Sequence, residues 1–317
     1  MQRELVSELG KMSDFSKVQK DKCVENTEDG GILMSREDWY KKLEIPLYVA
    51  FSRKIFPWYV QDTKGKDFSE NWKLTQDELW LVLYLAYLAN IGRRLCFSID
   101  QVFHCLTGRD PGKVSLAEIR KLFGLMESGV NKCNHVAEEN GGIRFKIDWG
   151  KKKDEIQRRG WVYGEVIVTP VTGRGGFVYF SAVELTALVD TFEGAQYKMA
   201  KGAWMLAYMK SQFLRLGDPS KEYCLPGYAG GVPTLADTVG MAYQTCKSYL
   251  RMLLDKKLIT LALQEDCKAN VYLAGMVPKA DELIQDIKRY GVISYRATKI
   301  GGRPTTKKEG EQDTFVV

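Results

Sequence analysis

The segment that most restricts the fold covers residues 234–275, TLADTVGMAYQTCKSYLRMLLDKKLITLALQEDCKANVYLAG. Apolar residues recur at helical spacing on both sides of Gly240-Met241, which predicts two short helices joined by a turn. From Leu258 onward the apolar residues alternate, first before and then after the polar segment 264–269, which predicts a β-hairpin.

The second of these helices, predicted over residues 242–254, has two different faces. Apolar residues at three- and four-residue spacing are expected to point inward, and these are Cys246, Tyr249, Leu250 and Leu253. The residues between them are polar, basic or amphipathic and add nothing to a core. A helix with such an exposed face is available to contact a partner.

The sequence VGMAYQTCKSYLRMLLDKKLI resembles the helix-turn-helix core of winged-helix DNA-binding domains. In that family a glycine begins the turn, a small apolar residue follows, and a leucine-rich helix leads into a leucine-isoleucine pair at the first strand of the wing. The matching residues are Gly240, Met241, Leu250, Leu253, Leu258 and Ile259. Lys257 departs from the pattern, because the family often has glycine there, and this leaves the end of the helix open.

The resemblance implies that the exposed helix face reads double-stranded DNA. An α-helix fits the major groove, where glutamine can bond adenine and arginine can bond guanine in two places each. Neighbouring lysines are suited to phosphate contacts. The predicted DNA-binding residues are Tyr243, Gln244, Thr245, Lys247, Ser248, Arg251, Lys256, Lys257 and Lys268. The alternative is that they form the solvated face of a winged helix that docks other proteins.

The same order of elements recurs in the first half of the chain. A helix over residues 74–91, helices after Ser98 and Ser115, and an alternating strand over 143–149 are predicted. The expected fold is therefore α+β and mostly helical, with two winged-helix (helix-turn-helix plus β-hairpin) domains in tandem. Glu138 and Glu139 are expected at the tip of the first wing, where carboxylates repel phosphate. The first domain is thus expected to dimerise or bind a partner, and DNA contact is the alternative.

Four parts are predicted along the chain. Residues 1–35 form a flexible N-terminal arm, and residues 36–158 form the first winged-helix domain, which ends in a charged linker. Residues 159–278 form the second, entered through a hairpin of 161–169 and 177–180. Residues 279–317 form a C-terminal helix and a disordered basic tail.

Composition excludes more than it identifies. A net charge of +6 and a pI near 8.8 are compatible with a polyanionic partner without requiring one. Seven scattered cysteines with no C-x-x-C pair fit a reducing compartment. The chain begins without a signal-peptide pattern, and its longest apolar run, residues 79–91, is short for a membrane span. A cytoplasmic protein without a membrane segment is expected.

No group of residues indicates catalysis or a cofactor. GRDPGKV at 108–114 is one residue short of a phosphate-binding loop and has Val114 where serine or threonine would hold magnesium. His104-Cys105 and Cys133-Asn-His135 have side chains that suit zinc, but core or surface roles are favoured for all four. The protein is expected to be neither an enzyme nor a metal or cofactor binder.

Two winged helices behind an arm resemble the replication initiator (Rep) proteins of plasmids, phages and mobile elements. The resemblance implies a homodimer that binds origin repeats in double-stranded DNA and recruits host replication proteins. A transcriptional regulator that binds operator repeats through the same surface is the alternative. A further alternative is a protein-interaction module without DNA affinity.

Overall fold

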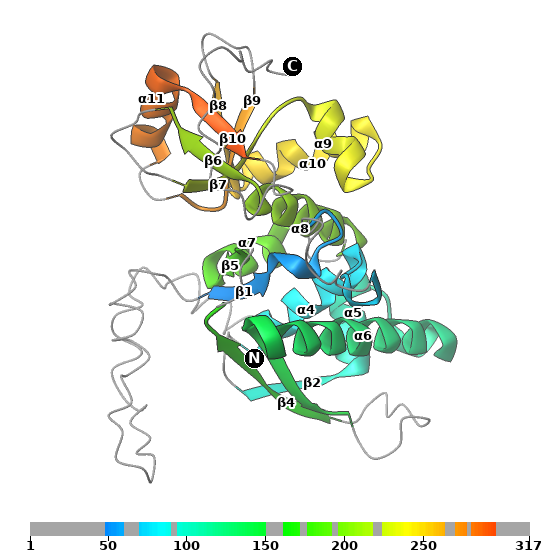
Figure 1. The fold of residues 1–317 in the computed structure, drawn as a ribbon. Helices are drawn as coiled ribbons and strands as arrows, with labels where there is room; N and C mark the ends of the chain where they lie inside the picture. Colours follow the sequence, from blue (N-terminus) through cyan, green and yellow to red (C-terminus); the bar gives the residue numbers. More distant parts are fainter. Residues whose placement is uncertain are drawn as a thin grey trace, which may run out of the picture. The chain divides into compact units, whose positions relative to one another are not determined.

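The fold is known from a computed structural model that describes residues 48–59, 70–89, 94–149, 161–171, 176–191, 196–217, 224–263, 270–277 and 280–295. In this part of the chain helices and strands are interspersed, and every strand pair is antiparallel (Figure 1). This mixture agrees with the predicted α+β class. The expected arm at 1–35, the tail after residue 295 and Lys268 lie outside the described residues. Among the helices that are described, none has the length and apolar character that a bilayer crossing requires.

The first half contains a helix, a strand, two helices and two strands. These are α4 (Gln76–Leu88), β2 (Arg94–Ser98), α5 (Ile99–Thr107), α6 (Leu116–Asn140), β3 (Gly142–Asp148) and β4 (Trp161–Thr169). The three strands form a sheet in the order β2-β4-β3. The side chains of Thr75, Ser98 and Ser115 each accept a backbone N–H bond in the first turn of the following helix. The helix starts predicted at Ser98 and Ser115 are confirmed, and the helix predicted over 74–91 covers residues 76–88.

The second half has a similar order of elements, except that an additional strand, β6 (Phe213–Leu216), stands between its first helix and the strand that corresponds to β2. It contains α8 (Gln196–Ser211), β7 (Cys224–Ala229), α9 (Val232–Val239), α10 (Tyr243–Asp255), β8 (Ile259–Leu263) and β9 (Asn270–Ala274). The strand order is β7-β9-β8, so the last strand lies between the other two, as β4 does in the first half. The sheet continues beyond β7 with β6 (Phe213–Leu216) and β10 (Val292–Tyr295), and α11 (Ala280–Tyr290) precedes β10.

The predicted hairpin between residues 161–169 and 177–180 is wrong. β4 pairs with β2 and β3, whereas β5 (Phe177–Ser181) pairs with β1 (Tyr48–Ser52). The physical reason is cross-strand packing: the buried Val162 and Val166 of β4 pair with the buried Phe97 of β2 and Phe145 of β3. The boundary expected at residue 158 therefore falls between two strands that pair with each other.

The helix predicted after Ser115 extends through the residues that were expected at the tip of the first wing. α6 continues to Asn140 because residues such as Cys133 and Val136 extend its buried face, and it ends at Gly141, where φ is 71°. Glu138 and Glu139 consequently lie exposed in the last turn of a helix. Their placement at a wing tip is wrong, and the electrostatic reason for keeping DNA away from the first wing is removed with it.

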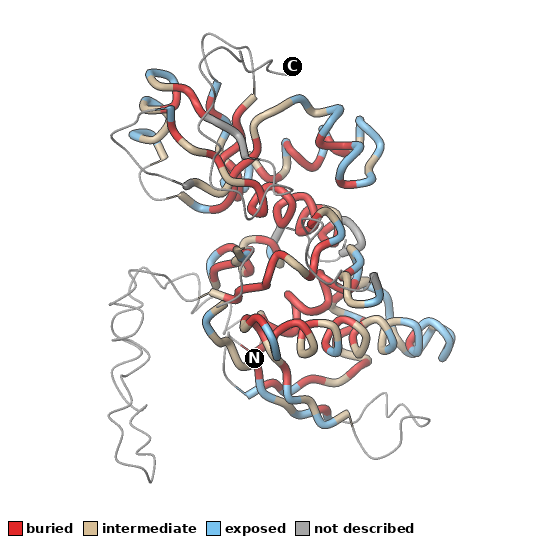
Figure 2. The backbone as a smooth tube through the Cα atoms, in the orientation of Figure 1, coloured by how far each residue is buried: buried red, intermediate tan, exposed pale blue. Residues whose placement is uncertain are grey.

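The two halves meet in a core built on two apolar helices. α4 packs against α8, and both are buried along most of their length (Figure 2). α4 begins with a capping box in which Glu78 accepts the Thr75 N–H at 2.7 Å. The same buried carboxylate accepts hydrogen bonds from Ser128 and from Lys132 Nζ, the latter at 2.7 and 2.8 Å. The cap of α4 is thereby tied to α6.

We expect Glu78→Gln to make the protein less sensitive to acid. Burial opposes ionisation of Glu78, but hydrogen bonds from Lys132, Ser128 and Thr75 outweigh it, so its pKa lies below the ordinary 4.5. A carboxylate with a lowered folded-state pKa stabilises the protein above the unfolded value, and this stabilisation is lost as the pH falls through the folded pKa. At pH 7 the variant should lose about 1 to 3 kcal/mol of unfolding free energy.

Urea unfolding of both proteins at pH 7 and at about pH 3 tests this expectation. The wild-type protein should lose more stability between the two pH values than the variant does. An equal loss in the two proteins would show that Glu78 does not stabilise the fold in its ionised form.

Candidate nucleic-acid interface

A short turn of defined geometry joins α9 to α10. Gly240 ends α9 in the left-handed conformation, with φ 68° and ψ 36°, and donates its N–H to the carbonyls of Ala236 and Asp237. Met241 donates to the Ala236 carbonyl at 2.9 Å. A Cβ atom on residue 240 would meet nothing within 4 Å, so the backbone angle, rather than crowding, favours glycine. The turn predicted at this residue is confirmed.

The buried face of α10 is the predicted one. Cys246, Tyr249, Leu250 and Leu253 are between 0 and 6% exposed. They hold α10 against α9, α8 and β8. The orientation of the opposite face is therefore fixed by packing rather than by the polar residues themselves.

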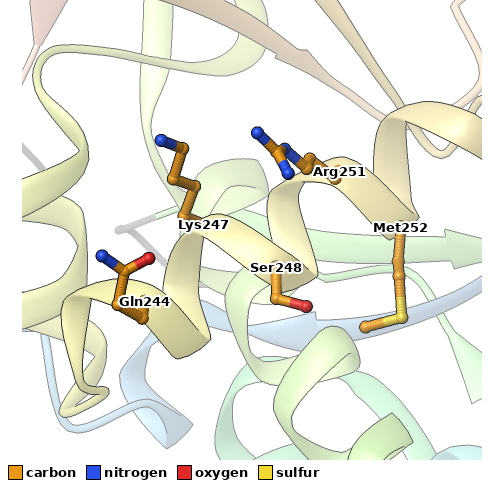
Figure 3. Close-up of a pocket in the computed structure, with 5 residues that line it drawn as sticks. All are labelled: Gln244, Lys247, Ser248, Arg251 and Met252. Atoms are coloured by element: carbon orange, nitrogen blue, oxygen red, sulfur yellow. The ribbon is translucent and has the colours of Figure 1, made fainter.

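The opposite face of α10 carries the predicted contact residues. Tyr243 is 44% exposed, and Gln244, Lys247, Ser248 and Arg251 are also exposed, while Thr245 is half-buried. Gln244, Lys247, Ser248 and Arg251 line an open hollow of about 300 Å³. Figure 3 shows Lys247 and Arg251, one turn apart, extending to the same side of the helix. A surface results that offers amide, hydroxyl and guanidinium groups together.

Met252 is a lining residue that the sequence analysis missed. Its half-buried side chain forms the apolar part of the hollow, one turn after Ser248. The four-residue spacing from Ser248 was the available signal, but a methionine in a leucine-rich helix is more typical of a core. In the part of the chain that the structure describes, no carboxylate forms an ion pair with Lys247 or Arg251. Both cations are thus available to an anionic partner.

Lys256 and Lys257 lie exposed where α10 ends. Lys257 has φ 58° and is the one non-glycine residue with positive φ among the described residues. Its N–H bonds to the Leu254 carbonyl, and the Leu258 N–H bonds to the Leu253 carbonyl, both at 2.9 Å. The position where the sequence departs from the winged-helix pattern is therefore a left-handed helix end, the conformation that glycine favours.

We expect Lys257→Gly to raise the free energy of unfolding by about 0.5 to 1 kcal/mol. A left-handed residue with a side chain costs about 1 to 2 kcal/mol, and the greater chain entropy of glycine offsets part of the gain. If Lys257 contacts a phosphate, the same variant should bind duplex DNA less tightly. The slope of log affinity against log salt concentration should become shallower by about one.

Lys257→Ala is the matched control because it removes the charge and keeps the strained backbone. It should lose the same DNA affinity without the gain in stability. Urea unfolding and fluorescence anisotropy measure the two effects separately, and a glycine variant less stable than wild type would contradict the expected strain.

The hairpin next to α10 is described only in its strands. β8 and β9 pair along their length, with Ile259 opposite Ala274 at one end and Leu263 opposite Asn270 at the other. Leu263 is 54% exposed. The tip at 264–269, with the predicted phosphate contact Lys268, lies outside the described residues. The structure therefore brings together eight of the nine predicted contact residues on or beside α10.

The histidines and cysteines considered for zinc do not come together. A ring nitrogen of His104 lies 3.1 Å from the Arg109 carbonyl, and His135 stacks on Trp72 with ring centroids 3.7 Å apart. Burial raises the pKa of the Cys133 thiol, which disfavours the thiolate that zinc needs. No group of three or more metal-binding side chains occurs among the described residues.

Three comparisons with known proteins gave no match: a scan against models of protein families, a search of curated proteins and a search of solved structures. The interpretation of this surface therefore depends on its own geometry and charge.

Proposed function

We propose that this chain binds double-stranded DNA sequence-specifically through α10 and initiates replication of a plasmid, phage or mobile element. The observation that supports it best is the two-sided character of α10. Its apolar residues are buried, and its exposed side offers Gln244, Lys247 and Arg251 from successive turns. A helix presented in this way is suited to the major groove.

The repeated architecture supports the tandem winged-helix part of the proposal. Both halves contain a strand, two helices and two further strands in this order, and in both the last of these strands pairs between the other two, although the second half has the extra strand β6 before β7. In the proposed arrangement α10 is the recognition helix and the β8–β9 hairpin is its wing. The first half forms a homodimer contact or binds host replication proteins.

Several contact residues have a role that their chemistry suits. Gln244 and Arg251 would bond base edges, and Met252 would contact a thymine methyl group. Lys247, Lys256 and Lys257 would contact phosphates and fix the register of the protein on DNA. Variants of the base-contacting residues should therefore lose affinity mainly for the specific site. Variants of the phosphate-contacting residues should lose affinity for all sequences.

Selection of duplex sites from a random library, followed by anisotropy titrations at several salt concentrations, tests DNA binding. Gln244→Ala and Arg251→Ala should weaken binding to the selected site by about 5- to 150-fold and relax the preference at one base pair each. Lys256→Ala should weaken binding to every duplex sequence by a similar factor. An absence of duplex affinity, or equal losses on every sequence for Gln244→Ala, would contradict sequence readout.

A replication assay tests the initiator role separately from DNA binding. The coding sequence with its native flanking DNA is placed on a circle that lacks another origin. Autonomous replication that is lost in Arg251→Ala is the expected result. A protein that binds DNA but supports no replication with its flanking DNA present would instead be a transcriptional regulator.

A further inference from the structure

One buried cation of this chain has no anionic partner in the part that the structure describes. Arg53 follows β1 directly, and its side chain is 2% exposed. Its Nε and Nη2 atoms are covered by the protein and have no hydrogen-bond acceptor. No carboxylate among the described residues forms an ion pair with it. Lys132 and Lys210, by comparison, lie 2.7 and 2.8 Å from carboxylate oxygens of Glu78 and Glu184.

Three segments of the chain meet at the guanidinium group of Arg53. Its backbone N–H donates to the Gly176 carbonyl at 3.2 Å, just beyond the end of the β1–β5 ladder (Figure 1). Its Cζ atom lies 4.8 Å from the ring centroid of Phe213, the first residue of β6. A Cβ atom on residue 176 would lie 3.2 Å from Cδ and 3.5 Å from Nη1 of Arg53. Arg53, Gly176 and Phe213 together form the Arg53 junction.

The Arg53 junction has a physical reason to open locally. Burial lowers the pKa of Arg53 from 12.5 to about 10, so the guanidinium group is still charged at neutral pH. A buried charge is destabilising unless an opposite charge and hydrogen bonds compensate it. The Phe213 ring supplies a cation–π contact, but this contact leaves the Nε and Nη2 hydrogens unsatisfied. Separation of the segments would let water hydrate Arg53.

The two unsatisfied atoms lie on one edge of the guanidinium group. Nε and Nη2 direct N–H bonds to the same side, whereas Nη1 is on the side of Cδ, next to Gly176. Two N–H bonds from one edge match two oxygens of a single oxyanion. The edge is covered in this structure, so an oxyanion can reach it only after the junction opens. A small free oxyanion suits the edge better than a polymer does, because three packed segments surround it.

We propose that Arg53 provides a latent site for a small oxyanion, which opens when β1 and β5 separate beside it. In the closed form the charge is buried without a partner. In the open form a phosphate or sulfate ion binds the edge formed by Nε and Nη2. The ion shifts the population toward the open form because it binds only that form. The site uses no residue of α10 and does not depend on the proposed function.

Hydrogen exchange of the full-length protein tests this site. The amides of β1 and β5 should exchange about 3-fold faster or more in millimolar sulfate than in chloride of the same ionic strength. The amides of β2 and β4 are the internal reference and should exchange equally in the two salts. Arg53→Met removes the charge and keeps most of the side-chain volume. It should slow exchange at β1 and β5 by about 10-fold or more and abolish the effect of sulfate.

Two further variants separate the charge of Arg53 from packing in general. Phe213→Leu removes the cation–π contact, so exchange at β1 and β5 should become faster, and much less so in the Arg53→Met background. Lys210→Met removes a buried cation that has a carboxylate partner. It should lower the urea midpoint of unfolding, whereas Arg53→Met should raise it.

Two results would overturn the latent site. One is an Arg53→Met protein in which the amides of β1 and β5 exchange as fast as in the wild type or faster. The other is wild-type exchange at these amides that is the same in sulfate and in chloride.

Discussion

Replacing Lys210 by methionine is expected to lower the free energy of unfolding by about 3 to 5 kcal/mol. The Lys210 side chain is fully buried, and its ammonium lies 2.8 and 2.9 Å from the two carboxylate oxygens of Glu184, which is 2% exposed. Glu184 belongs to α7 (Ala182–Thr191), where it also accepts the Ser181 N–H at 2.8 Å. Removal of Lys210 would leave a buried carboxylate without a cation.

The double variant Glu184→Gln/Lys210→Met should recover much of that loss. Burial lowers the pKa of Lys210 although Glu184 acts in the opposite direction, so desolvation outweighs the attraction within the pair. Removal of both charges is therefore expected to cost far less than removal of one. Exposed Lys288→Met on α11 is the control and should change stability by less than about 0.5 kcal/mol.

Urea unfolding measures the free energy of unfolding of the wild type, the single Lys210 variant, the double variant and the Lys288 control. A loss below about 1 kcal/mol in Lys210→Met, or a double variant as unstable as the single one, would contradict a tightly coupled buried pair. The pair also concerns the candidate interface, because Glu184 accepts the Met276 N–H at 3.1 Å just after β9. It thereby fixes the end of β9, which pairs with β8, the hairpin strand that contacts α10.

Charge reversal on α10 is expected to produce the largest loss of DNA affinity. The double variant Lys247→Glu/Arg251→Glu should bind its duplex site at least about 100-fold more weakly at physiological salt. It replaces two attractive contacts by like-charge repulsion from the phosphates. The slope of log affinity against log salt should become shallower by about two or more. Anisotropy titrations at several salt concentrations measure both quantities.

Lys288→Glu/Arg289→Glu provides a control with the same change in net charge. Both residues are exposed on α11, and the proposal assigns them no DNA contact. The control should change duplex affinity by less than about 3-fold, since exposed charges more than about 10 Å from DNA are largely screened. Equal losses in the two double variants would mean that net charge, and not the α10 surface, governs binding.

Local chemistry made part of the fold predictable. Thr75, Ser98 and Ser115 form their capping bonds within three residues, so the sequence contains both partners of each bond. The buried and exposed sides of α10 were predictable for a similar reason, because periodicity assigns residues to faces. Gly240 was predictable from the demand of the turn for a left-handed residue.

Long-range pairing was not predictable from the same signals. β4 and β5 both have alternating apolar and polar residues. Neither pattern indicates that β4 pairs with β2 and β3 while β5 pairs with β1. The Glu184–Lys210 contact was missed for the same reason, since its partners lie on different helices.

The β1–β5 ladder joins a strand that precedes the first set of elements to the strand that precedes the second. A protease cut between Val171 and Gly176 would therefore leave two fragments still hydrogen-bonded to each other. For the same reason, the protein could be reconstituted from two separately expressed polypeptides, one ending and the other beginning between residues 171 and 176. Neither polypeptide is suited to study alone, because each lacks one strand of this ladder.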